Sequence, residues 1–276
     1  MKKNVIISIL FLLLIFAGIF IYVRNNPKIN IQEKTLITLD GTDIKINEIS
    51  TGHDEALIIA PGWFMCKDSL PFQNMAQKFS KDFDVITMSF RGHCSSGGKF
   101  TFTSREYDDL NTVINFTRKN HKKVYVIGFS LGSATAIITQ YKYNNADKLI
   151  LVSPPADFYK IENHVWSKNA YIPTLKKFEL NTWANITPGK LWLKKIKPID
   201  VIEKISPTPI LVIAGGKDPI IFSWHSEQIF EKAKEPKKII IYDNGKHAED
   251  IYIENSEKFM NDCLNWLKNN DKILKI

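Results

Sequence analysis

The pentapeptide Gly128-Phe129-Ser130-Leu131-Gly132 constrains the fold of this chain more than any other feature. An apolar run at 123–127 precedes it and a segment rich in small residues follows it, which indicates a buried strand that turns sharply into a helix. Glycines are needed on both sides of such a turn because side chains there would collide as strand and helix approach each other. The pattern therefore predicts that Ser130 is held on a tight strand-turn-helix, the arrangement called a nucleophile elbow.

Strand-like and helix-like segments alternate along the rest of the chain. Continuous apolar strands separated by helices are typical of a mostly parallel sheet with helices on both faces. Ser104 has the residue type of a helix cap and is expected to begin the second helix. The predicted strands are 35–39, 44–49, 56–60, 85–90, 123–127, 148–152, 210–214 and 238–242, and the predicted helices are 69–79, 104–120, 223–234 and one near the C-terminus.

The N-terminal segment is not globular in character. From Val5 to Val23 the residues are apolar apart from Ser8 and a glycine, and as a helix they rise about 28 Å, close to the thickness of the hydrocarbon core of a bilayer. A cleaved signal peptide is the alternative, but the apolar stretch is long for one and no small-x-small cleavage site precedes Arg24. We expect an uncleaved transmembrane anchor over residues 1–24.

The remaining organisation follows from this anchor. Residues 25–34 are expected to be a linker and residues 35–276 one globular domain. Two lysines before the apolar segment favour an N-terminus on the cytoplasmic side, so the domain is expected outside the cytoplasm. The protein would then be a single-pass membrane protein.

The net charge of +8 is unevenly distributed along the chain. Residues 1–30 carry four basic and no acidic side chains, and residues 154–205 carry nine lysines against five acidic residues, so these two segments account for the whole excess. A basic membrane-proximal end and one basic segment fit an anionic membrane surface better than a nucleic-acid groove. We expect no nucleic-acid partner.

Three loops that follow apolar strands contain the residue types of nucleophilic catalysis. A serine hydroxyl needs a histidine to accept its proton and a carboxylate to orient that histidine. Asp218 follows one late strand and His247 follows the next, at the strand ends where open sheets place their sites. The order Ser130, Asp218, His247 is the order expected for a nucleophile elbow, with Asp157 as the alternative carboxylate.

With these motifs the chain resembles the α/β-hydrolase superfamily, and within it the bacterial serine aminopeptidases and monoglyceride-lipase-like hydrolases. The resemblance implies a Ser130–Asp218–His247 triad, an oxyanion hole made by the backbone N–H groups of Trp63 and Leu131, and a small helical cap at about 154–205. It rests on five segments in the same order, 60–63, 89–97, 128–132, 215–218 and 245–247.

Two departures from the family pattern stand out. The oxyanion loop has Pro61-Gly62 where relatives often have His-Gly, which leaves the backbone donor in place. The Arg-Gly-His-Gly pattern is replaced by Arg91-Gly92-His93-Cys94, which brings a thiol near the expected site. In the family the histidine of this loop is structural, and His93 is expected to be so here.

The three cysteines, Cys66, Cys94 and Cys263, have no metal-ligand spacing, and an odd number excludes complete pairing. Small buried thiols are the favoured interpretation, with a Cys66–Cys94 bridge between neighbouring loops as the alternative. No cluster in the sequence has the spacing of a metal site, so we expect neither a metal nor a cofactor.

The predicted reaction is hydrolysis of a carboxylic ester through an acyl-enzyme. The expected membrane tether favours an acyl or lipid ester as the small-molecule substrate. The same triad also cleaves peptides and thioesters, so an aminopeptidase or a thioesterase is the alternative, and a non-catalytic binding module is a more distant one. The expected cap carries five aromatic residues that either pack it onto the body or form, with its lysines, a surface for acyl chains or anionic lipid: Tyr159, Trp166, Tyr171, Trp183 and Trp192.

Overall fold

The computed structural model describes residues 30–158, 160, 168, 186–190 and 192–268. The chain divides into two compact units, Met1–Ile31 and Gln32–Ile276. The predicted membrane anchor and half of the expected cap lie outside the described residues. No helix within the described ranges is long and apolar enough to cross a membrane.

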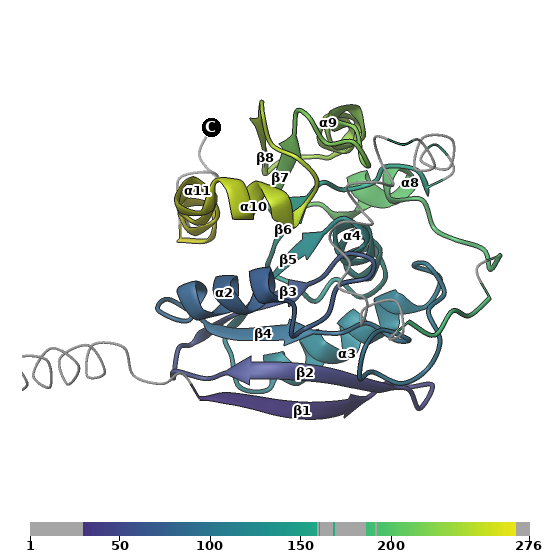
Figure 1. The fold of residues 1–276 in the computed structure, drawn as a ribbon, viewed down its shortest axis with the longest axis vertical. Coiled ribbons are helices and arrows are strands. Elements are labelled where there is room, and N and C mark those ends of the chain that lie inside the picture. The colour runs from purple at the N-terminus through teal and green to yellow at the C-terminus, as the bar shows by residue number, and fades with distance from the viewer. Residues whose placement is uncertain (1–29, 159, 161–167, 169–185, 191, 269–276) are drawn as a thin grey trace, which may run out of the picture. The chain divides into compact units, whose positions relative to one another are not determined.

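One eight-stranded sheet forms the centre of the second unit, in the order β1-β2-β4-β3-β5-β6-β7-β8. β2 pairs with β4 antiparallel, and the pairs from β4 through β8 are parallel, so the predicted mostly parallel sheet is confirmed. β1 and β2 run in opposite directions (Figure 1). The strands are β1 (Ile31–Ile37), β2 (Asp43–Ile49), β3 (Glu55–Ala60), β4 (Asp84–Met88), β5 (Lys123–Phe129), β6 (Lys148–Val152), β7 (Ile210–Gly215) and β8 (Lys237–Tyr242).

The helices lie in two layers on opposite faces of the sheet (Figure 1). One layer contains α2 (Leu70–Phe79), α10 (Glu249–Glu254) and α11 (Ser256–Lys268). The other contains α3 (Glu106–Arg118), α4 (Leu131–Tyr143), α8 (Pro198–Val201), the 3₁₀ helix η1 (Ile202–Ile205) and α9 (Ser223–Lys232). Helices on both faces explain why β3, β5, β6 and β7 are almost continuously apolar and buried.

Two expected boundaries were wrong. The first strand begins at Ile31, inside the expected linker, rather than at residue 35. Ser104 does not cap α3, because its hydroxyl donates to the carbonyl oxygen of Leu193 at 3.4 Å and the helix begins at Glu106. The carboxylate of Glu106 accepts hydrogen bonds from the backbone and the hydroxyl of Thr101 instead, at 2.6 and 2.9 Å.

The loop that follows β4 is anchored by a buried arginine. The guanidinium of Arg91 donates to Asp109 on α3 at 2.6 and 2.8 Å and to Asp40 in the β1–β2 turn at 2.8 Å. Asp109 also accepts the backbone N–H of Arg91 at 2.9 Å. Charged groups inside a protein need such partners, and here they attach the loop to two separate elements.

The segment 154–205 leaves the sheet after β6 and returns at α8. The backbone N–H of Ile199 donates to the carbonyl oxygen of Ala156 at 3.1 Å, so the start of this segment and its return are joined to each other. Val201, Ile202 and Ile205 then pack into the main core beside α4. The described end of the segment therefore belongs to the body of the domain.

Cys66 and Cys94 form a disulfide, with their Cα atoms 6.2 Å apart. This distance lies within the range that a disulfide spans. The favoured interpretation of three free thiols was therefore wrong for this pair. Cys263 is free and buried in α11, and burial raises the pKa of its thiol.

Candidate active site

The elbow has the backbone geometry that its glycines allow. Ser130 lies between β5 and α4 with φ at 50° and ψ at −111°, a conformation that non-glycine residues rarely adopt. A Cβ atom at Gly128 would lie 2.6 Å from the backbone nitrogen of Ser133, and one at Gly132 would lie 2.5 Å from the carbonyl oxygen of Pro61. Any side chain at either position would thus push strand, helix and the neighbouring loop apart.

Hydrogen bonds to the end of β6 hold the elbow in place. The backbone N–H of Ser130 donates to the carbonyl oxygen of Val152 at 2.8 Å. The hydroxyl of Ser133 donates to the carbonyl oxygens of Gly128 and Val152, at 2.6 and 2.9 Å. These bonds fix the backbone of the turn, and the side chain of Ser130 on it is half-buried.

The structure brings Asp218 and His247 together at the carboxyl ends of β7 and β8. Nδ1 of His247 lies 2.8 Å from Oδ2 of Asp218, and both side chains are buried. The other carboxylate oxygen, Oδ1, accepts the backbone N–H groups of Ile220 and Ile221, each at 2.8 Å. In the neutral ring Nδ1 then carries the proton and donates it to the carboxylate, which leaves Nε2 as the acceptor.

The loop of His247 is bonded to the same strand end as Ser130. The backbone N–H of Ala248 donates to the hydroxyl of Ser153 at 3.1 Å, and Ser153 directly follows the Val152 that holds the elbow. Ala248 and Ser153 both have positive φ, 49° and 47°. Such strained backbone is found most often at functional sites. Through these bonds the loop of His247 and the elbow of Ser130 both attach to the segment Val152–Ser153.

Trp63 lies in the loop between β3 and α2, next to the elbow. A Cβ atom at Gly62 would lie 3.4 Å from the carbonyl oxygen of Phe129 and 3.5 Å from Cβ of Ser130. The backbone N–H of Met65 donates to the carbonyl oxygen of Gly62 at 3.2 Å, which closes a turn around Trp63. Leu131 is the first residue of α4, where N–H groups have no acceptor inside the helix.

The alternative residues are engaged elsewhere. Asp157 accepts a hydrogen bond from Lys197 at 2.9 Å, and it is Asp218 that contacts His247. His93 is 1% exposed, its Nδ1 lies 3.1 Å from the carbonyl oxygen of Arg91, and its ring meets Phe100 edge-on. Burial lowers the pKa of His93 to about 4, only partly opposed by that carbonyl, so His93 stays neutral at pH 7.

An aromatic cluster beside the elbow was not singled out from the sequence. Trp63 stacks on Phe64 and Phe100, with ring centroids 4.3 and 5.9 Å apart, and meets Phe102 edge-on at 5.4 Å. Phe102 meets Phe158 at 5.2 Å, and Phe100 and Phe158 share a buried cluster with Leu131. We call Trp63, Phe64, Phe100, Phe102 and Phe158 the aromatic cluster. Its members come from three loops, so no periodic pattern marks them.

Trp63 is the exposed member of this cluster, with 40% of its surface accessible, while Phe102 is half-buried and the other three are buried. Phe64 and Phe102 have positive φ, 65° and 55°, which is rare for bulky residues. The cluster therefore presents one accessible apolar surface on a rigid base, next to the residues predicted to form the oxyanion hole.

The aromatic residues expected in the cap are largely untested. Tyr159, Trp166, Tyr171 and Trp183 lie outside the described residues, and Trp192 is 81% exposed. Across the described ranges, no group of three His, Cys, Asp or Glu side chains is arranged to hold a metal ion.

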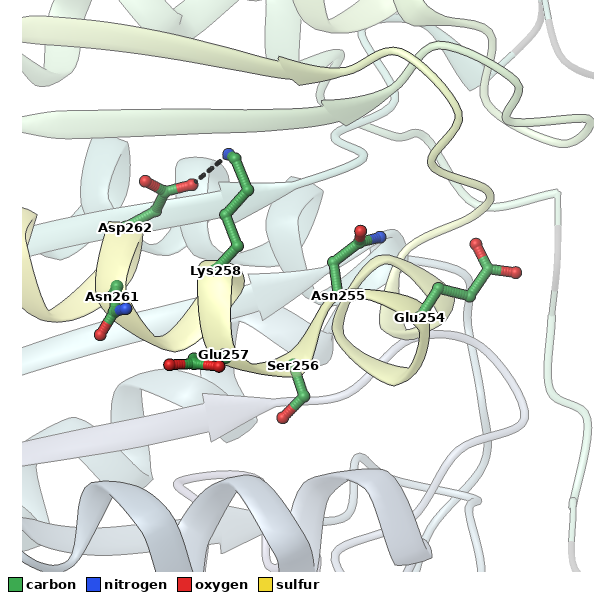
Figure 2. Close-up of a pocket in the computed structure, with 7 residues that line it drawn as sticks. All are labelled: Glu254, Asn255, Ser256, Glu257, Lys258, Asn261 and Asp262. Carbon is green, nitrogen blue, oxygen red and sulfur yellow. Dashed lines mark hydrogen bonds and ion pairs between the residues drawn. The ribbon is translucent and has the colours of Figure 1, made fainter.

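A separate hollow of about 520 Å³ lies where α10 meets α11. Figure 2 shows that its lining residues come from one stretch of chain and are polar or charged, with Lys258 paired to Asp262 at 2.8 Å. None of the predicted site residues lines it. It is an open surface depression rather than the candidate active site.

The described sheet and its two helix layers have the arrangement of the α/β-hydrolase fold, and comparison with known proteins agrees. A sequence profile described as the alpha/beta hydrolase fold matches residues 55–168. Over these residues the sequence is similar to the α/β-hydrolase superfamily.

Individual relatives are more distant. YqkD, an uncharacterised protein of Bacillus subtilis (strain 168), is 29% identical over 79% of this chain and 74% of its own length. YfhR, an uncharacterised protein of Escherichia coli O157:H7, is 26% identical over 67% of this chain and 63% of its own length. Among solved structures, the esterase Pf2001 of Pyrococcus furiosus is similar with a TM-score of 0.74 at 19% identity, over 88% of this chain and 92% of that one.

Proposed function

We propose that this protein is a serine hydrolase that cleaves carboxylic esters through an acyl-enzyme. The observation that carries the proposal is the buried pair of His247 and Asp218, 2.8 Å apart, beside an elbow that holds Ser130 at positive φ. A histidine oriented by a carboxylate is what a serine hydroxyl needs to become a nucleophile. The fold shared with an esterase adds support but does not by itself assign the reaction.

In the proposed mechanism Ser130 attacks the ester carbonyl while Nε2 of His247 accepts its proton. Asp218 holds the ring in the required tautomer and stabilises the charge that the ring acquires. The backbone N–H groups of Trp63 and Leu131 donate to the oxyanion, each contributing about 3–4 kcal/mol to the stability of the tetrahedral intermediate. His247 then protonates the leaving alcohol, and water repeats the sequence to release the acid.

The first test is labelling with a fluorophosphonate, using the full chain in detergent micelles beside its Ser130→Ala variant. Such probes react with serines whose hydroxyl is activated by a neighbouring base. Labelling of the wild type that disappears in the variant supports an activated serine at position 130. A folded wild type that stays unlabelled would favour the binding-module alternative instead.

A substrate panel tests the reaction class. We expect esters to be cleaved faster than aminoacyl amides or thioesters carrying the same acyl group, and an opposite ranking would move the assignment to an aminopeptidase or a thioesterase.

We further propose an ester with an apolar acyl group as the substrate. The accessible surface of the aromatic cluster adjoins the elbow, and aromatic side chains bind apolar groups through large contact areas. The predicted membrane anchor over residues 1–24 would keep the site close to lipid, which favours an acyl or lipid ester.

The proposed location is a single-pass membrane protein whose catalytic domain, with a cap inserted at about 154–205, lies outside the cytoplasm. The Cys66–Cys94 disulfide supports this side of the membrane, because disulfides persist in oxidising compartments and are rare in the cytosol. Protease treatment of intact cells or spheroplasts tests the topology. Digestion of the domain without lysis is expected, whereas protection until lysis would place it in the cytoplasm.

A further inference from the structure

The disulfide lies at a position where it bears on the reaction. Cys66 is three residues beyond Trp63, in the loop predicted to supply one oxyanion donor. Cys94 belongs to the loop after β4, and both cysteines are half-buried. The bond therefore joins a loop that faces the elbow to a second loop that contributes no residue to the predicted triad.

The loop after β4 is a rigid support. Besides the arginine contacts to Asp109 and Asp40, the backbone N–H of Gly92 donates to the carbonyl oxygen of Gly97 at 2.8 Å. The hydroxyl of Ser96 donates to the carbonyl oxygen of Ser89 at 2.8 Å and accepts the backbone N–H of Lys45 at 2.9 Å. Cys94 thus belongs to a loop attached to β2, to α3 and to the β1–β2 turn.

The oxyanion loop, which contains Trp63, is held by different contacts at its two ends. At its start Gly62 packs against Phe129 and Ser130. At its end the backbone N–H of Lys67 donates to the hydroxyl of Ser89 at 3.0 Å, and the hydroxyl of Thr87 donates to the carbonyl oxygen of Lys67 at 3.1 Å. The backbone N–H of Cys66 donates to the hydroxyl of Ser69, and the disulfide fixes its side chain. Trp63 lies between these two ends.

The side chain of Trp63 packs on Phe64, Phe100 and Phe102 but leaves 40% of its surface exposed. A backbone bond of 3.2 Å from the N–H of Met65 to the carbonyl oxygen of Gly62 closes the turn that contains Trp63. A cross-link one residue beyond this turn restricts how far the turn can open.

We propose that Cys66 and Cys94 are positioning residues of the active site. Their disulfide holds the backbone N–H of Trp63 where it and the N–H of Leu131 can donate to the same oxyanion. This inference rests on the proposed function, since it assigns the bond to the oxyanion hole of that reaction. An oxyanion donor acts in the transition state rather than on the bound ester. Loss of the bond should therefore lower kcat and leave KM nearly unchanged.

The position of Cys94 offers a matched pair of variants. Cys94 has φ at 53°, a conformation that favours glycine. Cys94→Gly removes the bond while relieving backbone strain, whereas Cys66→Ser removes it and leaves Cys94 in place. Cys263→Ala, which removes the free buried thiol, is the control.

The experiment measures kcat, KM and the melting temperature of the full chain in detergent, with a short-chain p-nitrophenyl ester and the fluorophosphonate probe. Both single variants are expected to lose between about 10-fold and 100-fold in kcat, with KM within about threefold of the wild type. The double variant should lose no more than either single variant, because all three lack the same bond. Cys263→Ala should retain the wild-type kcat.

A merely structural bond gives a different result. If the variants melt at lower temperature but keep the wild-type kcat well below that temperature, the inference is overturned and the proposed function stands. Alkylation followed by mass spectrometry that finds Cys66 and Cys94 as free thiols in the wild type would also overturn it. A folded wild type that neither reacts with the probe nor hydrolyses any ester would overturn the proposed function and this inference with it.

Discussion

Two buried histidine–aspartate pairs lie at opposite edges of the sheet. At the carboxyl edge Nδ1 of His247 contacts Asp218 at 2.8 Å, and at the amino edge Nε2 of His121 contacts Asp84 at 3.1 Å. All four side chains are buried. Burial and a carboxylate partner therefore do not by themselves distinguish a catalytic histidine from a structural one.

The second ring nitrogen makes the difference. Nδ1 of His121 lies 2.8 Å from the carbonyl oxygen of Thr117, so both nitrogens of this ring are used for structure. Asp84 additionally accepts the backbone N–H groups of Thr51, Gly52 and His53 at 2.8 to 3.1 Å, and thereby closes the end of a loop. Nδ1 of His247 contacts its aspartate, and the His247 loop is bonded to the strand end to which Ser130 is also bonded.

The largest expected effect separates the two histidines. His247→Ala should lower kcat for ester hydrolysis by about 10⁵-fold, because the serine loses its base. His121→Ala should leave kcat within about threefold and lower the free energy of unfolding by about 2 kcal/mol, because Asp84 loses a buried partner. Initial rates at saturating ester and urea unfolding measure the two effects. A folded His121→Ala enzyme as inactive as His247→Ala would break the comparison.

The two carboxylates at the carboxyl edge provide the second contrast. Asp218→Asn should lower kcat by about 10⁴-fold, because an amide favours the wrong tautomer of His247. Asp157→Asn, which removes the partner of Lys197, should change kcat by less than about threefold. The measurement is kcat at pH 7 for both folded variants. Losses of similar size would return Asp157 to consideration as the carboxylate that orients His247.

The amino-edge pair should affect stability in a pH-dependent manner. Burial raises the pKa of Asp84, but hydrogen bonds from His121, Thr51, His53 and Ser50 outweigh it, so the pKa lies below its usual value. A lowered pKa stabilises the folded state above the unfolded value of about 3.9, and the contribution disappears as pH falls through the folded value. Asp84→Asn should therefore cost about 2 kcal/mol at pH 7 and progressively less below about pH 4.

Urea unfolding of the wild type and Asp84→Asn between pH 3 and pH 8 checks this expectation. The gap between the two proteins should be constant from pH 5 upward, since the carboxylate is ionised in both states there. A gap that widened toward acid pH would mean that the folded-state pKa is raised, and the amino-edge pair would then need a different explanation.

The smallest expected effect concerns the aromatic cluster. Phe102→Ala should lower the preference for an octanoyl over an acetyl ester, expressed as a ratio of kcat/KM values, by about tenfold, because apolar contact for the longer chain is lost. Leu39→Ala is the control, since Leu39 is 96% exposed and removes apolar surface of similar kind in the β1–β2 turn. An unchanged ratio in Phe102→Ala would remove this cluster from the substrate-binding surface.

Local patterns in the sequence predicted most of the fold. The strand before the elbow was expected at 123–127 and is observed at Lys123–Phe129, because a run of apolar residues next to small residues is a local signal. The order of motifs also predicted that Asp218 and His247 are neighbours, and the structure places them in contact. Their catalytic roles, and that of Ser130, stay predictions.

The rest depends on contacts between residues far apart in the chain. Ser104 has the residue type of a cap, yet its hydroxyl bonds to Leu193, which no local rule anticipates. The Cys66–Cys94 bond needs two loops to be fixed before the cysteines can meet, and a spacing of 28 residues does not reveal it. The pair of Asp84 and His121 shows the same limit, since neither residue lies in a motif.

The hydrogen bond between Ile199 and Ala156 has a consequence for how this protein can diversify. The two ends of the segment between these residues are thus bonded to each other, close after the Val152–Ser153 step to which both the elbow and the histidine loop are bonded. Insertions or deletions between such joined ends need not move the rest of a domain. New substrate preferences can thus arise there by changes within the segment, while the attachment of the Ser130 and His247 loops is inherited unchanged.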